Sequence, residues 1–273
     1  MAHSIDPAAG AVRGFVPARN DEERYLMRHI EDLADAAFSR GIARYSAFLS
    51  DREQDLARAA LGRAGVQDGW RFDGGWPEAE RRVLCLEPEY SYGECPVRCV
   101  QLQCRALPGA VLPAHKDYLG SLMGLALKRE ALGDILLPAD APGTAYVFAL
   151  EPAAKLICRE LCQAGRTEVS TRLLEPEEIP AFPVPERQLL TATVSSLRLD
   201  SVLSVGFSLS RSKAAEAVTS GKVQVNWADW QKPDRQVVQG DVLTLRGLGK
   251  CVLEEVGNQT KKGRVFITVK RYL

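Results

Sequence analysis

The chain has 273 residues, and 35 Lys and Arg balance 35 Asp and Glu, so its formal net charge is zero. Hydrophobic residues make up 46% and charged residues 26%, as in an ordinary globular protein. No apolar run is long enough to span a membrane, and the first residues lack the basic start and apolar core of a signal peptide. We therefore expect a cytoplasmic protein of two or three domains.

The cysteines show neither a disulfide framework nor a metal-binding pattern. An odd count without regular spacing predicts free, mostly buried thiols. Cys95, Cys99 and Cys104 are the one cluster in sequence, but their spacings form no CxxC pair and no histidine lies close by. We expect no metal site and no cofactor. The cysteines are Cys85, Cys95, Cys99, Cys104, Cys158, Cys162 and Cys251.

In the N-terminal part, we expect a flexible arm over residues 1–20 and a helical region over residues 21–75. In 21–39, apolar residues recur at helical spacing after an acidic first turn. Ser50 with Glu53 three residues later forms a capping box, which predicts a second helix through about Leu61.

The middle part, residues 76–176, alternates short strand and helix patterns. The order is β-β-α-β-β-α-β, with the first two strands in RVLCLEPEY and VRCVQLQCRAL and a long helix in KDYLGSLMGLALKREALG. This order predicts a ferredoxin- or RRM-like α+β domain with helices on one face of a sheet. Residues 177–192 contain three prolines and predict a linker.

The C-terminal part, residues 193–273, is positively charged, although the net charge of the whole chain is zero. It holds 13 Lys and Arg against 7 Asp and Glu, a net charge of +6, so residues 1–192 carry −6. Ser210 predicts the N-cap of a helix with Ala214, Ala217 and Val218 on its buried face, and Gly221 predicts its end. A shorter helix precedes it and several strands follow. We expect two helices packed on a small β-sheet.

The segment SRSK places Arg211 and Lys213 in the first turn of that helix. A helix N-terminus carries about half a positive charge, so cations there are disfavoured. The two side chains either point into water, where screening reduces the cost, or hold a phosphate together with the Ser210 and Ser212 hydroxyls.

Other cations favour the phosphate interpretation, because most of them also occupy helix starts and turns. Phosphates reach such positions easily, and phosphate binding predicts affinity that falls steeply with salt. The candidate RNA-binding residues are Arg198, Ser210, Arg211, Ser212, Lys213, Lys222, Asn226, Arg246, Lys250, Lys261, Lys262 and Arg264.

The segment RLDSVLSVGFSLSRSKAAEAVTSGKVQVNW resembles the S4 RNA-binding domain. It has the family's Arg-Leu-Asp, a helix, Ser-Arg with a basic residue, a small-residue helix and Gly-x-Val-x-Val-Asn. The resemblance implies that the helix beginning at Ser210 faces structured RNA, with Arg198, Arg211 and Lys213 as contacts to its backbone. It also implies that Asp200 orients the fold rather than touching RNA.

Further segments resemble the bacterial YlmH family, also called RqcP. They are FDGGWPEAERR, HKDYLGSLMGLALKREALGDILL, VSSLRLDSVLS, QGDVLTLRGLGK and TKKGR. This resemblance implies a monomeric accessory translation factor that binds rRNA and tRNA on stalled large ribosomal subunits. It would support C-terminal alanine tailing of nascent chains beside a larger quality-control factor, with no DNA or membrane partner. Older family descriptions also link it to cell division.

Catalysis is the alternative that the middle part raises. His115 and Asp117 could form an acid/base or metal pair, but Asp117 could equally cap the helix that follows. No second histidine, P-loop or HExxH occurs nearby, so we expect a protein that is not an enzyme. An RNA-modifying enzyme with an unrecognised body and a scaffold for division proteins remain the alternatives. For Arg81 and Arg82 we expect at least one internal salt bridge, with the other extending the RNA surface.

Overall fold

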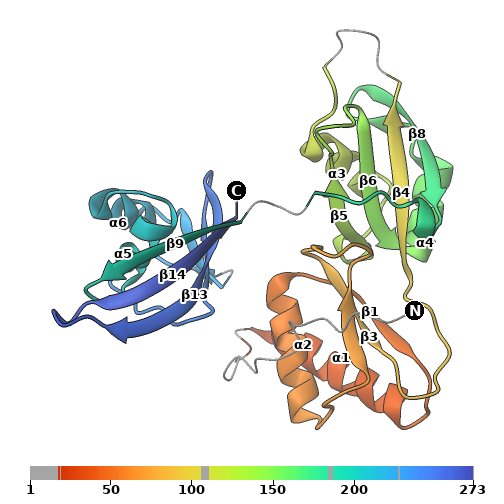
Figure 1. The fold of residues 1–273 in the computed structure, drawn as a ribbon. Helices are drawn as coiled ribbons and strands as arrows, with labels where there is room; N and C mark the ends of the chain where they lie inside the picture. Colours follow the sequence, from red (N-terminus) through yellow and green to blue (C-terminus); the bar gives the residue numbers. More distant parts are fainter. Residues whose placement is uncertain (1–17, 19, 106–110, 184–186, 227, 273) are drawn as a thin grey trace. The chain divides into compact units, whose positions relative to one another are not determined.

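The structure, a computed structural model, describes residues 18, 20–105, 111–183, 187–226 and 228–272. It divides into two compact units, an N-terminal unit of residues 1–182 and a C-terminal unit of residues 183–273 (Figure 1). This division falls inside the predicted linker. The predicted arm over residues 1–20 lies outside the described residues, apart from Ala18 and Asn20.

The first part of the N-terminal unit packs two helices on a three-stranded antiparallel sheet of order β1-β3-β2. Asn20 caps the first helix by accepting from the Glu23 N–H at 2.8 Å, and the Ser50 N–H donates to Glu53 at 2.7 Å at the start of the second helix. The elements are α1 (Asp21–Phe38), β1 (Arg44–Leu49), α2 (Asp51–Arg63), β2 (Trp70–Asp73) and β3 (Arg82–Leu86).

Strand β3 corrects the predicted domain assignment. We predicted a helical region over 21–75 and placed RVLCLEPEY in the middle sheet, but β3 pairs with β1 and β2. Its alternating residues serve two cores: Leu84 packs under α1 and α2, whereas Val83 and Cys85 face the middle sheet. A strand that is apolar on both faces carries no signal of which sheet it joins. The first part therefore has the two predicted helices and, in addition, a small sheet.

The middle of the N-terminal unit has the predicted ferredoxin-like arrangement. Its sheet order is β5-β6-β4-β8-β7 with antiparallel neighbours, and α3 and α4 pack on one face (Figure 1). The other face meets β1 and β3 through a cluster that includes Phe48 and Phe148. The elements are β4 (Val97–Cys104), α3 (His115–Gly124), β5 (Leu132–Leu136), β6 (Thr144–Leu150), α4 (Glu151–Glu160), β7 (Gln163–Ala164) and β8 (Thr167–Leu174).

Helix α3 is shorter than predicted. The chain leaves it after Gly124, and Ala126 has a φ of 58°, which a continuing right-handed helix does not allow. A single 3-10 turn, Arg129–Ala131, leads into β5. A second one, Pro176–Glu178, follows β8.

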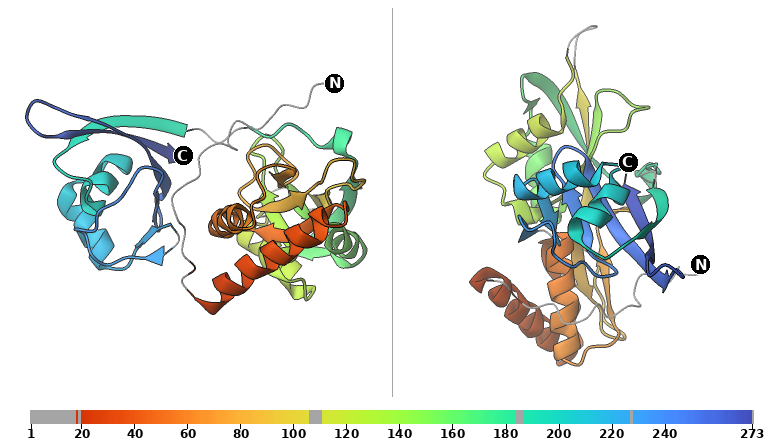
Figure 2. Two further views of the ribbon diagram at one scale, coloured as in Figure 1. Left: turned by 90° about the horizontal axis from the view of Figure 1, so that it is seen from below. Right: turned by 90° about the vertical axis from the view of Figure 1, so that its left-hand side faces the viewer.

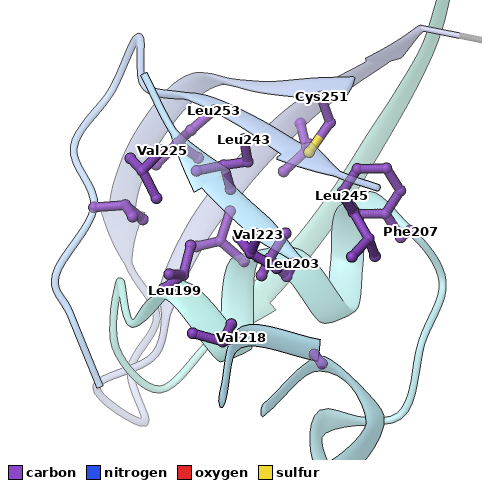
Figure 3. Packing of buried hydrophobic residues seen from close by; sticks show 14 of the residues in the cluster. Leu199, Leu203, Phe207, Val218, Val223, Val225, Leu243, Leu245, Cys251 and Leu253 are labelled. Carbon is purple, nitrogen blue, oxygen red and sulfur yellow. The ribbon is translucent and has the colours of Figure 1, made fainter. Parts of the chain in front are cut away.

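The C-terminal unit packs α5 and α6 on a six-stranded antiparallel sheet of order β11-β10-β12-β13-β14-β9 (Figure 2). Its core draws on Leu203, Val218 and Leu243, from both helices and the sheet (Figure 3). The elements are β9 (Arg187–Val194), α5 (Leu199–Gly206), α6 (Arg211–Thr219), β10 (Val223–Val225), β11 (Ala228–Asp229), β12 (Val242–Leu245), β13 (Gly249–Gln259) and β14 (Val265–Tyr272).

Strand β9 corrects the predicted linker, because residues 187–192 are paired strand rather than free chain. The pairing with β14 runs from Arg187 opposite Tyr272 to Val194 opposite Val265. It covers an edge of β14 that would otherwise present unpaired main-chain groups.

Candidate nucleic-acid interface

The start of α6 is built as predicted, with Ser210 as its N-cap. The Ser210 Oγ accepts from the Lys213 N–H at 3.3 Å and lies 3.1 Å from the Ser212 Oγ. Ala214 and Val218 are buried, whereas Arg211, Ser212 and Lys213 are exposed. The first turn of α6 thus presents two hydroxyls and two cations at the surface.

Asp200 explains how this helix tolerates one of its cations. The Asp200 side chain is 5% exposed, and its carboxylate accepts from Arg198 Nε at 3.1 Å and Nη2 at 2.9 Å, while Arg211 Nε lies 3.5 Å away. Burial alone would raise the pKa of Asp200, but the Arg198 hydrogen bonds and the Arg211 charge outweigh burial and lower it. The two guanidinium groups stay partly exposed, so Asp200 holds them in place at the surface.

A hollow of about 300 Å³ lies between α6 and the turn that joins β12 to β13. Three cations from three segments border it, Lys213 from the start of α6, Lys222 after its end and Arg246 from the turn. None of these three side chains has an ion pair or hydrogen bond with another described residue. We call this site the basic hollow. Its lining is Leu209, Lys213, Glu216, Ala217, Ser220, Lys222, Leu245, Arg246 and Leu248.

The remaining predicted cations lie elsewhere on the unit. Lys250 stands over the Tyr272 ring at 4.8 Å, near the basic hollow along the chain. Lys261 and Lys262 are exposed in the turn between β13 and β14, and Arg264 there donates to Thr193 Oγ1 at 3.0 Å. Strand β13 separates the two turns by 11 residues, a length on the order of 30 Å. The predicted residues therefore form two groups, not one surface.

Asn226 has a structural role inside the unit. Its φ is 48°, its Oδ1 accepts from the Val242 N–H at 2.9 Å, and its Nδ2 donates to Asp241 Oδ1 at 2.7 Å. These contacts use both ends of the side-chain amide to hold the turn after β10. We predicted Asn226 as an RNA contact, and these contacts lead us to leave it out of the proposed interface.

The motifs of the N-terminal unit meet at Asp134, a connection that sequence reasoning missed. The Asp134 carboxylate accepts from Trp76 Nε1 at 3.0 Å, from the Glu80 N–H at 2.8 Å and from the Arg81 N–H at 3.1 Å. The GGWPEAERR loop and the Gly-Asp of β5 thus belong to one hydrogen-bonded network. The glycine-rich composition of the first motif was the available signal for a tight loop.

Within the described part of the chain, neither Arg81 nor Arg82 makes the predicted salt bridge. Arg81 Nε donates to the Leu132 carbonyl at 2.9 Å and Nη2 to the Phe48 carbonyl at 3.1 Å, while Arg82 Nε donates to the Ala79 carbonyl at 2.7 Å. Burial lowers the pKa of Arg81. Both guanidinium groups are therefore committed to main-chain oxygens.

His115 and Asp117 are arranged as a helix start. His115 is the exposed first residue of α3, and Asp117 accepts from the Ala114 N–H at 2.9 Å. Asp117 thus caps the helix, as the alternative to catalysis predicted, although it does so from inside the first turn of α3 rather than from in front of the helix. Separately, none of the helices that the structure describes is long and apolar enough to cross a membrane.

Two family models match this chain, the S4 domain over residues 197–243 and the putative RNA-binding domain in YlmH over residues 111–178. The first covers α5, α6 and the strands as far as β12, and the second covers most of the ferredoxin-like part. These matches define the class, an S4-domain RNA-binding protein with a second, putative RNA-binding domain.

The chain belongs to the YlmH family. It is 34% identical over 225 residues to the ribosome-associated protein quality control protein P2 of Bacillus subtilis (strain 168), a match that covers 82% of this chain and 85% of that relative. Among solved structures it is similar to the cell division protein ylmH from Streptococcus pneumoniae, with a TM-score of 0.46 and 17% identity over 61% of this chain and 100% of that one.

Proposed function

We propose that the C-terminal unit binds structured RNA at the start of α6 and in the basic hollow. The observation that carries this proposal is the convergence of Lys213, Lys222 and Arg246, which have no partner in the described part of the chain, on one hollow. Among the described residues that line the hollow, Glu216 is the one acidic residue, so the three cations leave the hollow with a net positive charge that favours an added anion. Leu209, Leu245 and Leu248 add apolar surface against which a ribose or base can pack.

The first turn of α6 supplies the rest of a phosphate site. Free main-chain N–H groups and the helix dipole favour an anion there, and the Ser210 and Ser212 hydroxyls can donate to it. Arg198 and Arg211 lie beside this turn in positions that Asp200 fixes. Guanidinium groups held in place lose less freedom on binding than mobile side chains do. We therefore place the phosphate contacts at Arg198, Arg211 and Lys213, with Lys222, Arg246 and Lys250 extending them.

On a larger scale, we propose an accessory translation factor that acts in the cytoplasm as a monomer. It would bind rRNA and tRNA on stalled large ribosomal subunits and support C-terminal alanine tailing of nascent chains, without catalysing a reaction. The name of the Bacillus subtilis relative supports a ribosomal role, and the two matched domains support two RNA contacts. The acidic N-terminal unit would then position the basic C-terminal unit on the particle.

Cosedimentation with purified large ribosomal subunits over a range of salt concentrations tests this proposal. We expect binding at low salt that is lost as salt rises. The double variant Lys213→Gln with Arg246→Gln is expected to lose most of the binding. Its control is Arg28→Gln with Arg40→Gln, which removes the same charge from exposed positions of the N-terminal unit and should bind like the wild type.

Two results would overturn the proposal. Absence of the wild-type chain from the subunit fraction at low salt would remove the ribosomal role. Turnover of a modified nucleoside by the purified chain would favour the RNA-modifying alternative. The proposed role in alanine tailing has its own test. Mass spectrometry measures the alanine tails on stalled nascent chains in cells with the wild type or the double variant, and we expect fewer tails with the double variant.

A further inference from the structure

Two cysteines that the sequence does not group meet in the N-terminal unit. Cys85 lies on β3 and Cys95 in the loop before β4, and their sulfur atoms and a carboxylate oxygen of Asp73 all lie within 4.8 Å of one another. Cys85 is fully buried and Cys95 is half-buried. The pair thus combines one thiol that solvent reaches with one that it does not.

The loop that carries Cys95 is held against β1. A Cβ atom at Gly93 would lie 2.6 Å from the Tyr45 hydroxyl oxygen and 2.9 Å from the Ala43 Cβ, so only glycine fits there without a shift. Tyr45 is in turn the register partner of Cys85 across β1 and β3. This packing brings Cys95 close to Cys85, although the two are ten positions apart in the chain.

Among the described residues, the charged groups around the pair leave no free carboxylate for a bound cation. Arg71 forms ion pairs with Asp73 and with Glu87, the latter at 3.0 Å, and the Asp73 Oδ1 accepts from the Gly75 N–H at 2.8 Å. The carboxylate that would complete a metal site is therefore occupied by a guanidinium and a main-chain donor. The positive charge of Arg71 at this position opposes a bound metal ion.

The two thiols also differ in acidity. The hydrogen bond between them raises the pKa of Cys85, as does burial, and the same hydrogen bond lowers the pKa of Cys95. Burial and the Asp73 charge oppose this lowering for Cys95, whereas the Val97 main-chain hydrogen bond and the Arg71 charge support it. A thiolate that is accessible and adjacent to a second thiol is the arrangement of a redox-sensitive cysteine pair.

We propose that Cys85 and Cys95 form a reversible disulfide, with hydrogen peroxide as the oxidant. The Cys95 thiolate attacks one peroxide oxygen, the O–O bond breaks, and the departing hydroxide takes a proton to become water. The Cys85 sulfur then attacks the sulfenic sulfur, the S–O bond breaks, and the Cys85 proton leaves with the hydroxide as a second water. Two thiols and one peroxide thus give one disulfide and two waters, and an added dithiol reverses the change.

Peptide mapping can detect the disulfide between Cys85 and Cys95, because protease sites lie on both sides of each cysteine. Trypsin cleaves after Arg82 and Arg98, and a glutamate-specific protease that cleaves after Glu89 and Glu94 then leaves Cys85 and Cys95 on separate short peptides. In the full chain treated with hydrogen peroxide, we expect these two peptides to be joined and to separate with dithiothreitol. Exposed Cys162 serves as the internal control and should react more slowly than Cys95.

Variants separate this mechanism from unspecific oxidation. In Cys85→Ser, Cys95 lacks its partner, so we expect its oxidation to continue to the sulfinic acid. Hydrogen exchange of the loop, residues 87–96, should slow on oxidation of the wild type and not of Cys85→Ser. Failure of peroxide to join the two peptides, or oxidation of Cys162 ahead of Cys95, would overturn the proposal. So would one Zn²⁺ retained by the reduced wild-type chain after gel filtration and lost in Cys95→Ser.

Discussion

The two units use similar basic motifs in opposite ways. In the N-terminal unit, Arg81 of GGWPEAERR turns inward and donates to the Leu132 and Phe48 carbonyls. In the C-terminal unit, Lys213 of SRSK and Arg246 line the basic hollow and have no partner in the described residues. A basic residue beside glycines or serines therefore does not define a binding site by itself. The two cases differ in whether the fold itself provides oxygen atoms that accept hydrogen bonds from the cation.

Asp134→Ala tests the inward half of the comparison and should have the largest effect. It leaves the Trp76 Nε1 and the Glu80 and Arg81 N–H groups without an acceptor, so we expect the free energy of unfolding of the N-terminal unit to fall by about 3 kcal/mol. Urea denaturation measures this change. Asp140→Ala, at an exposed carboxylate in the turn after β5, is the matched control and should stay within about 0.5 kcal/mol. A loss of RNA binding with no loss of stability would contradict the structural role.

Asp200→Asn tests Arg198 and Arg211, which are bound by a carboxylate of the fold and are also partly exposed at the surface. It removes the charge that Arg198 and Arg211 share, and we expect α5 and α6 to lose about 2 kcal/mol of stability at neutral pH. Amide hydrogen exchange in these helices measures the loss.

The contribution of the Asp200 carboxylate to the stability of α5 and α6 depends on pH. Because the pKa of Asp200 is lowered in the folded chain, its contribution is complete above the unfolded value of about 3.9 and is lost as the pH falls through the lower folded value. The wild type should therefore lose stability in α5 and α6 on acidification below about pH 4. Asp200→Asn should lack this component of the loss. Equal acid sensitivity in both chains would contradict the assignment.

Asn226→Ala tests a residue that we first predicted to bind RNA. Loss of its hydrogen bonds to Val242 and Asp241 should lower the stability of the C-terminal unit by about 1.5 kcal/mol. The salt dependence of RNA binding should not change. Asn258→Ala, at an exposed position of β13, is the control for stability. A smaller salt slope with unchanged stability would restore Asn226 to the interface.

Ser210→Ala should have the smallest effect. Loss of the α6 cap is expected to lower the stability of α6 by about 1 kcal/mol. Amide hydrogen exchange in α6 measures this loss. Ser212→Ala, which removes the neighbouring hydroxyl without removing the cap, is the matched control. Equal effects of the two variants on stability would show that Ser210 is not the cap.

The fold was predictable from sequence where each segment carries its own signal. The Ser50 capping box, the Ser210 cap and the alternation of β and α elements in the middle part are local patterns, and the structure has all three. The partner of β3 and the pairing of β9 with β14 were not predictable, since neither strand encodes which edge it joins. Such choices depend on contacts between residues far apart in the chain.

The candidate site follows the same rule. Ser210 and Lys213 could be placed at the start of α6 because caps and turns are local. The grouping of Lys213 with Arg246, the separation of Lys261 from both, and the meeting of Arg198 with Arg211 at Asp200 all require the folded unit. Sequence thus identified candidate residues but could not sort them into sites.

The salt dependence of binding to a structured RNA hairpin tests the central claim most directly. We expect the logarithm of the association constant to fall linearly with the logarithm of salt concentration. In Lys213→Gln with Arg246→Gln, the magnitude of this slope should decrease by about 2, one for each lost phosphate contact, whereas in Arg28→Gln with Arg40→Gln it should match the wild type. Equal slopes in all three chains would show that the basic hollow does not bind RNA phosphates.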